Sequence, residues 1–132
     1  MEARGSARRA VTVLAVDDQA SFRSALRSVV AASPTFVLAG EAESGEAALL
    51  LVNELDPDLV LMDVRMPGIG GISAAREIKR RGHRTIVLLL STTHPDELPR
   101  EASNCSADGI VWKGDLRAGL LEGILAARAH SD

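Results

Sequence analysis

The segment LVLMDVRMPGIGG at residues 59–71 places a run of apolar residues directly before Asp63 and continues into a loop with Pro67 and several glycines. Continuous apolar runs of this length are typical of parallel strands that are covered on both faces of a sheet. Asp63 could be interpreted as a turn residue before Pro67, but a carboxylate that closes an apolar strand is costly to bury without a partner. The segment therefore predicts a buried strand whose carboxyl end carries a functional aspartate.

Further apolar runs lie on either side of this segment, so that strands are predicted at residues 11–16, 36–42, 58–62, 85–90 and 108–112. Between these runs, apolar residues recur at helical spacing. The predicted inward faces of the helices consist of Phe22, Leu26, Val29 and Val30; Ala48, Leu51, Val52 and Leu55; Ile72, Ala75 and Ile78; and Leu116, Leu120, Leu121, Ile124 and Leu125. Strands that alternate with helices through right-handed crossovers predict an α/β fold, a doubly wound five-stranded parallel sheet with five helices.

Several helix ends have local signals. Ser44 is the expected N-cap of the second helix, and Pro57 ends that helix. Gly82 is the expected C-cap of the third helix, and Asp115 the expected N-cap of the last one.

The fourth helix has the weakest signal, because Pro95 and Pro99 fall in its segment. A proline beyond the first turn removes a backbone hydrogen bond and clashes with the preceding turn. If Asp96 is the N-cap, Pro99 lies in the first turn, where its missing N–H costs nothing. We therefore expect a short fourth helix that starts late.

The composition sets the broad class of the protein. A chain of 132 residues, 46% of them hydrophobic, can form one domain with a sizeable core and is not disordered. No apolar stretch approaches the ~18 residues that span a bilayer, so no membrane association is expected. A single cysteine favours a reducing cytoplasm, and a net charge of −3 excludes a basic field for wrapping nucleic acid. We expect a mobile tail at residues 1–10 and one domain at residues 11–132.

Polar residues follow the predicted strands where those strands end. In an open parallel sheet, ligands bind beyond the carboxyl ends of the strands, near the point where the strand order reverses. The first strand is followed by Asp17 and Asp18, the third by Asp63, the fourth by Ser91 with Thr92 as its competitor, and the fifth by Lys113. We expect these side chains to converge on one edge of the sheet.

This set of residues favours magnesium and phosphoryl transfer. Three carboxylates at short range repel one another, so a proton or a cation must join them. Ligands that are all oxygen favour Mg²⁺, whereas His83, His94 and His130 lack paired metal-ligand spacing and Cys105 stands alone, which leaves zinc unsupported. A metal and an ammonium group can neutralise a transferring phosphoryl group while an aspartate oxygen attacks it and forms an acyl phosphate.

Four strings of the sequence together resemble the receiver domain of bacterial two-component response regulators, most closely the NarL/LuxR-type branch. They are VLAVDDQASFRSAL, LVLMDVRMPGIGG, IVLLLS and ADGIVWK, and they extend over nearly all of the chain from Val11 onward. Each motif alone is weak, but the ordered set at the strand ends is specific. The resemblance implies the flavodoxin-like receiver fold with strand order 2-1-3-4-5.

The resemblance also implies a role for each matching residue. Asp63 would be the phosphoryl acceptor, and Mg²⁺ would bind Asp18, Asp63, the backbone carbonyl of Arg65 and, directly or through water, Asp17. Ser91 would bind a phosphoryl oxygen and Lys113 its charge, and Ser91 with Ile110 would occupy the switch positions. The implied phosphoryl donor is a sensor histidine kinase, and the chain would not be an enzyme beyond its own phosphorylation and dephosphorylation. A second copy of the chain is a candidate partner, and DNA would be bound only through an output domain.

Three positions depart from the family pattern. Ile110 stands where receivers usually have Tyr or Phe as a rotameric switch, Gly114 where proline often follows the lysine, and Ser106 where glycine is frequent. Isoleucine has no ring to bury or expose, so the usual aromatic coupling cannot operate in that form. We therefore expect intact phosphorylation chemistry with an unconventional readout.

Two other functions compete with the phospho-acceptor switch. Ile110 and the two prolines favour an interaction module that works without phosphorylation. A small α/β phosphatase is disfavoured, because those enzymes have their acids two residues apart after the first strand, whereas Asp17 and Asp18 are adjacent. The chain ends at Asp132 without a helix-turn-helix segment, so we expect no output domain within it, and it is either a natural single-domain receiver or a fragment of a longer transcription factor.

Overall fold

The computed structural model describes residues 10–97 and 106–131 of the chain. Five parallel strands form one sheet in the order β2-β1-β3-β4-β5, which confirms the predicted sheet and its strand order. The strands are β1 (Val11–Val16), β2 (Phe36–Ala42), β3 (Leu59–Asp63), β4 (Ile86–Ser91) and β5 (Gly109–Trp112). The first two agree with the predicted ranges, and the other three begin one residue later than predicted.

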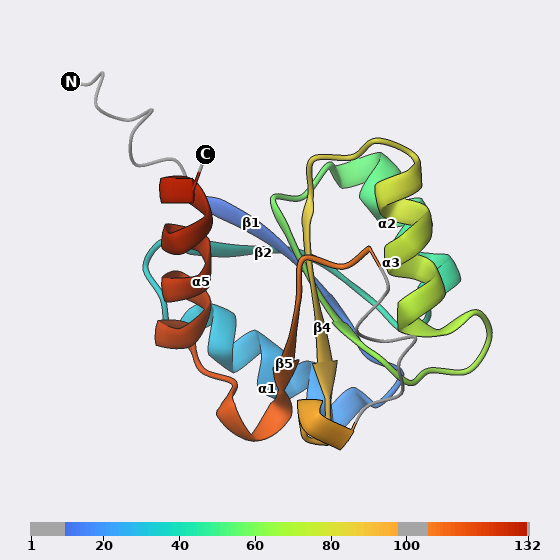
Figure 1. Cartoon of the computed structure of the whole chain (residues 1–132), viewed down its shortest axis with the longest axis horizontal. Coiled ribbons are helices and arrows are strands. Elements are labelled where there is room, and N and C mark those ends of the chain that lie inside the picture. The colour runs from blue at the N-terminus through green and yellow to red at the C-terminus, as the bar shows by residue number, and fades with distance from the viewer. Residues whose placement is uncertain (1–9, 98–105, 132) are drawn as a thin grey trace.

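Helices cover both faces of this sheet, with α1 and α5 on one face and α2 and α3 on the other (Figure 1). Their bounds are α1 (Ala20–Ala31), α2 (Gly45–Leu55), α3 (Gly70–Arg80) and α5 (Ala118–Ser131). Two short 3-10 turns, η2 (Pro95–Glu97) and η3 (Lys113–Asp115), follow β4 and β5. No helix in the described residues has the length and apolarity that a bilayer-spanning helix needs.

The sheet separates two hydrophobic cores. On the central strand β3, Leu59 and Leu61 pack into the core under α1 and α5, while Val60 and Met62 pack into the core under α2 and α3. All four side chains are fully buried. This burial on both faces explains why the strand is a continuous apolar run and not an alternating one.

Local chemistry sets the ends of α2. The Ser44 hydroxyl accepts a hydrogen bond from the backbone N–H of Ala47 at 3.1 Å, as expected of an N-cap. At the other end Asp56 adopts a left-handed conformation with φ 47°, directly before Pro57. Gly82, the predicted C-cap of the third helix, has φ 83° and follows the capping residue Arg81.

Two expectations about the helices, the fourth helix and the N-cap of the last helix, differ from the structure. The described residues contain four α-helices and not five: Asp96 lies inside η2, and Pro99 with the rest of the predicted fourth helix lies outside the described residues. Asp115 does not cap the last helix, because it belongs to η3 and α5 begins at Ala118. The reason is that Leu116 is extended, with φ −71° and ψ 120°, which separates the turn from the helix.

Candidate functional site

The carboxyl ends of β1, β3, β4 and β5 meet at one edge of the sheet, the lower end in Figure 1. A cavity of about 240 Å³ lies there, lined by Asp18, Gln19, Asp63, Val64, Arg65, Ser91, Thr92 and Lys113. The structure therefore brings together the residues that the strand ends were predicted to supply. Ile110 does not line the cavity: it is half-buried and packs against the core under α2 and α3.

Three carboxylates form the centre of the site. One carboxylate oxygen from each of Asp17, Asp18 and Asp63 lies within 4.8 Å of the other two. Their exposure differs, since Asp17 is fully buried, Asp63 is half-buried and Asp18 is exposed. The cluster therefore has an interior wall and an open side from which a ligand could enter.

Asp17 is held from several directions. Its Oδ1 accepts a hydrogen bond from the backbone N–H of Gln19 at 2.8 Å, and its Oδ2 accepts one from Lys113 Nζ at 3.1 Å. Its own N–H donates to the Ala42 carbonyl at 3.1 Å, and its carbonyl accepts from Arg23 at 2.7 Å. These contacts account for a carboxylate with no solvent exposure, since a buried charge needs partners.

Lys113 connects two of the carboxylates. Its Nζ lies 3.1 Å from Asp17 Oδ2 and 3.4 Å from Asp63 Oδ1. The same ammonium stands 3.8 Å from the ring centroid of Phe22, on the first turn of α1. This aromatic face provides an attractive surface for the cation and holds it over the acidic cluster.

The surroundings of Asp63 disfavour the charged form of its carboxyl group. Burial raises the pKa of Asp63 above 3.8, and the charge of Asp17 raises it further. Lys113 and a hydrogen bond from the backbone of Arg65 act in the opposite direction without cancelling the effect of burial. The net effect of these groups is that the pKa of Asp63 lies above its usual value, chiefly because the carboxyl group is partly buried.

The three clustered carboxylates of the site fit a hard divalent cation. Among residues 10–97 and 106–131, the grouped side chains that could ligate a metal here are the carboxylates of Asp17, Asp18 and Asp63, which offer oxygen atoms. The ammonium of Lys113 does not balance their three charges. Mg²⁺ prefers such ligands and keeps several of its waters, which the open side of the cavity can accommodate. The residues present therefore fit Mg²⁺.

The loop after β3 holds the end of that strand against α3. A Cβ atom on Gly71 would lie 2.0 Å from the Asp63 carbonyl oxygen, so only glycine permits this approach. Gly68 has φ 83°, which also favours glycine. Gly71 thus lets α3 begin against the backbone of Asp63.

Ser91 and Thr92 both line the cavity, so the structure leaves the choice between them open. Ser91 is buried and its hydroxyl accepts a hydrogen bond from the Thr93 N–H at 2.9 Å. The Thr92 carbonyl accepts a hydrogen bond at 3.2 Å from the indole of Trp112, whose ring lies 5.6 Å from that of His94. Trp112 thus links the end of β5 to the loop after β4.

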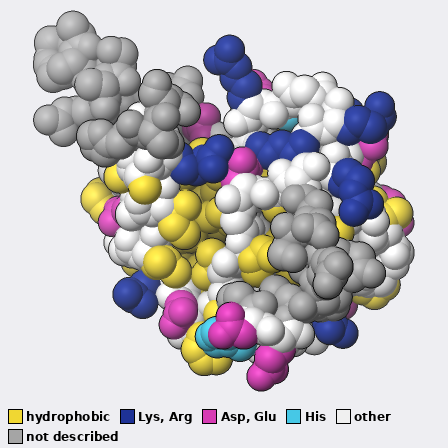
Figure 2. Space-filling model, viewed as in Figure 1, with side chains coloured by type: hydrophobic (Ala, Val, Ile, Leu, Met, Phe, Trp, Pro, Cys, Tyr) yellow, Lys and Arg dark blue, Asp and Glu magenta, His cyan; other side chains and the backbone are white. Residues whose placement is uncertain are grey.

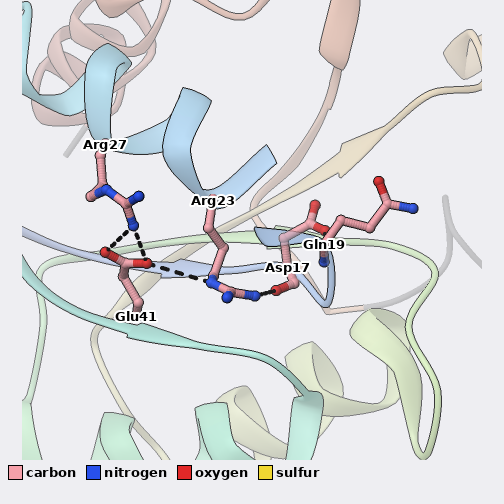
Figure 3. A network of polar contacts seen from close by, with 5 residues as sticks. All are labelled: Asp17, Gln19, Arg23, Arg27 and Glu41. Carbon is pink, nitrogen blue, oxygen red and sulfur yellow. Dashed lines mark hydrogen bonds and ion pairs between the residues drawn. The ribbon is translucent and has the colours of Figure 1, made fainter. Parts of the chain in front are cut away.

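The sequence did not reveal the residues that surround the acidic cluster. Phe22 appeared only as one member of a helical apolar stripe, and nothing in the sequence pairs Arg23 with Glu41. These two lie on α1 and β2, and Figure 3 shows how Arg23 reaches both Glu41 and the backbone of Asp17. A cluster of basic residues on one face of the expected first helix was the available signal, but it does not identify their partner.

Known proteins resemble this chain in sequence and in fold. A family model described as the response regulator receiver domain matches residues 13–124. The transcriptional regulatory protein YdfI of Bacillus subtilis is 37% identical over 101 residues, which are 76% of this chain and 47% of that protein. The response regulator GacA of Pseudomonas aeruginosa is 37% identical over 118 residues, 89% of this chain and 54% of that protein. The chain thus spans about half the length of the curated relatives it matches.

Solved structures agree with these sequence matches. The signal receiver domain of the putative response regulator NarL from Mycobacterium tuberculosis superposes with a TM-score of 0.81 at 30% identity, covering 90% of this chain and 96% of that one. A LuxR-family two-component response regulator from Aurantimonas sp. SI85-9A1 gives a TM-score of 0.80 at 29% identity, covering 92% and 86% of the two chains.

Proposed function

Because the chain belongs to the response regulator receiver family, and is the receiver domain of a two-component response regulator, we propose that its Asp63 accepts a phosphoryl group from a sensor histidine kinase in the presence of Mg²⁺. The observation that carries this assignment is the position of Asp63, which borders the cavity, lies in the acidic cluster and contacts Lys113 at 3.4 Å. Asp17 has no solvent exposure and cannot be reached in the same way.

One group of residues in the site would bind Mg²⁺. Asp18, Asp63 and the backbone carbonyl of Arg65 would hold Mg²⁺, with Asp17 directly or through water. When bound, Mg²⁺ supplies positive charge to the carboxylates and to the oxygens of the transferring phosphoryl group.

In the proposed transfer, a carboxylate oxygen of Asp63 forms a bond to phosphorus while the nitrogen–phosphorus bond of the donor phosphohistidine breaks. The histidine nitrogen leaves with the electron pair and takes a proton from solvent. Lys113 pairs with the charge on the phosphoryl oxygens, and the hydroxyl of Ser91 donates a hydrogen bond to one of them. Neither group needs to cross the cavity, because both already line it.

The proposal is tested with beryllofluoride or acetyl phosphate in the presence of Mg²⁺, followed by NMR or intact mass. In the wild type we expect one acyl phosphate per chain from acetyl phosphate and one bound beryllofluoride from the mimic, and in Asp63→Asn we expect neither. Asp115→Asn is the matched control, since Asp115 is an exposed aspartate two residues after Lys113, and it should be phosphorylated like the wild type. An adduct that persists in Asp63→Asn would refute the assignment.

A second candidate function is an interaction module that does not depend on phosphorylation. Ile110 favours it, because this side chain packs against the core under α2 and α3 and has no ring to move. The amide NMR spectrum with beryllofluoride distinguishes the two functions. A phosphorylation switch predicts shifts in β5 and at Trp112 besides those in the cavity, whereas shifts confined to the cavity would support the second function.

We further propose that the chain belongs to a longer protein, in which phosphorylation of Asp63 controls an output domain that binds DNA. Support comes from the relatives, one of which is named a transcriptional regulatory protein and is about twice as long as the region it shares with this chain. A second copy of the receiver is a further proposed partner, and sedimentation of the phosphorylated and unphosphorylated chain tests that pairing.

A further inference from the structure

Two carboxylates of the acidic cluster follow each other in the chain, and Arg23 holds the peptide group between them. Nη1 of Arg23 donates a hydrogen bond of 2.7 Å to the carbonyl oxygen of Asp17. This carbonyl belongs to the same rigid, planar peptide group as the backbone nitrogen of Asp18. Figure 3 shows this contact between Arg23 and Asp17. The guanidinium of Arg23 therefore fixes the plane from which the side chain of Asp18 departs.

The carboxylate of Asp18 depends on its backbone for its direction. Asp17 is held by contacts to its N–H, its carbonyl and both carboxylate oxygens. Asp18, in contrast, is exposed, and within residues 10–97 and 106–131 no hydrogen bond or ion pair fixes its side chain. A change in the Asp17–Asp18 peptide plane would therefore displace Asp18 more than Asp17.

Arg23 is itself held in place by Glu41 on β2. Its Nε lies 3.5 Å from Glu41 Oε1, and Glu41 accepts two further bonds of 2.7 Å from Arg27. The side chain of Arg23 is only 16% exposed, while that of Arg27 is 49% exposed. Both arginines thus share one acidic partner, but only Arg23 reaches the acidic cluster.

From this geometry we infer that Arg23 is a positioning residue for the divalent cation, which acts by presetting the direction of Asp18. The inference rests on the proposed function, in which Asp18 is a metal ligand. Arginine suits this role because its planar fork presents nitrogens to two groups at once, here an ion pair with the Glu41 carboxylate and a hydrogen bond to the Asp17 carbonyl, whereas a lysine ammonium lacks this fixed fork geometry.

Charge and geometry make opposite predictions for the loss of Arg23. Removing a cation close to three carboxylates should strengthen the binding of Mg²⁺ if only electrostatics matter. Removing the group that orients a ligand should weaken it, typically by ~10-fold or more, as seen for residues that orient metal ligands. The sign of the change therefore separates the two effects.

The experiment is an NMR titration of the metal-free chain with MgCl₂ at constant ionic strength, following the amide signals of Asp18, Gln19 and Asp63. Arg23→Ala should raise the Kd by ~10-fold, and Arg23→Lys should give an intermediate value. Arg27→Ala is the matched control, since it removes a positive charge and a contact to Glu41 without touching Asp17. Its Kd should equal that of the wild type or be lower.

Thermal unfolding of the same variants provides the second measurement. Both alanine variants lose a contact to Glu41 and should unfold at a lower temperature, so a purely structural role would change Tm in both and weaken Mg²⁺ binding in neither. Wild-type or tighter affinity in Arg23→Ala would overturn the inference. If Arg23→Ala does not fold, Arg23→Lys decides: weaker binding at unchanged charge supports the inference, and wild-type affinity overturns it. A wild type without saturable shifts would overturn the magnesium proposal itself, which is a different result.

Discussion

At Asp63, burial and the positive charge of Lys113 shift the pKa of one carboxyl group in opposite directions. Burial raises its pKa, as does Asp17, while Lys113 lowers it. A group whose pKa is higher in the folded protein than in the unfolded chain binds its proton more tightly in the folded state. Above pH 3.8 its ionisation therefore opposes folding, and stability falls as the pH rises toward the pKa of the folded state.

The first prediction concerns the pH dependence of stability at this residue. Asp63→Asn removes the ionisation, so at neutral pH without Mg²⁺ this variant should have a higher free energy of unfolding than the wild type. The difference should shrink as the pH falls and vanish below 3.8, where the aspartate is protonated in both states. Urea unfolding at several pH values measures it.

Asp115→Asn again serves as the control, because Asp115 is exposed and its variant should follow the wild type at each pH. A lower stability of Asp63→Asn at neutral pH would show that the contact with Lys113 outweighs burial.

For the residues of the site, the sequence predicted where each side chain lies better than it predicted which side chains contact one another. The acidic residues, Ser91 and Lys113 were placed at one edge because parallel strands align their carboxyl ends. The partners of Asp17 could not be predicted in the same way, since Arg23 and Glu41 are brought together by the packing of α1 beside β2. Their roles in binding remain proposals.

At the scale of elements, the start of α3 is set by a single close approach. Gly71 faces the carbonyl of Asp63 at a distance that leaves no room for a methyl group, whereas a Cβ on Gly123, within α5, would meet nothing within 4 Å. Both glycines lie in helices, so helix propensity acts in the same direction at both positions. The two positions differ in the space that a methyl group would find.

The second prediction uses this difference. Gly71→Ala should lower the free energy of unfolding by about 1–3 kcal/mol, because the backbone must shift to admit the methyl group. Gly123→Ala should raise it by about 0.5–1 kcal/mol, as expected of alanine in a helix interior. Urea unfolding followed by circular dichroism measures both, and equal effects of the two substitutions would contradict the steric argument.

The elements also show where local sequence signals succeed and fail. Ser44 caps α2 as predicted, because the interaction involves residues three apart in one chain segment. Asp115 has the right chemistry for a cap but lies in η3, and the extended Leu116 separates that turn from α5. A side chain suited to capping thus does not by itself set where a helix begins.

At the scale of the whole molecule, two helical layers share one sheet. Asp108, just before β5, joins them, since its carboxylate lies 2.7 Å from Lys79 on α3 and 2.9 Å from Arg128 on α5. Figure 2 shows hydrophobic side chains beside α5 on the viewed face and basic side chains toward α3. Every strand contributes side chains to both cores, so neither layer can unfold without exposing the sheet.

The third prediction is that the two cores unfold together. Leu121→Ala in α5 and Ile78→Ala in α3 each remove a fully buried side chain, from opposite faces of the sheet. Each should lower the free energy of unfolding by about 2–5 kcal/mol. In both variants, circular dichroism and the fluorescence of Trp112, the single tryptophan of the chain, should report one coincident transition in urea. Separate transitions would show that the layers are independent.

The amino-acid sequence by itself determined the parallel sheet, its strand order through family resemblance, and the edge at which the acidic residues gather. The sheet and its edge follow from patterns within short segments, where the period of apolar residues sets both the element and its buried face, whereas the strand order was implied by the resemblance alone. Only the tertiary structure decided which carboxylate is sealed and which is open, and which arginine reaches the cluster. These properties depend on distances between side chains that lie far apart in the chain, and no local pattern encodes such distances.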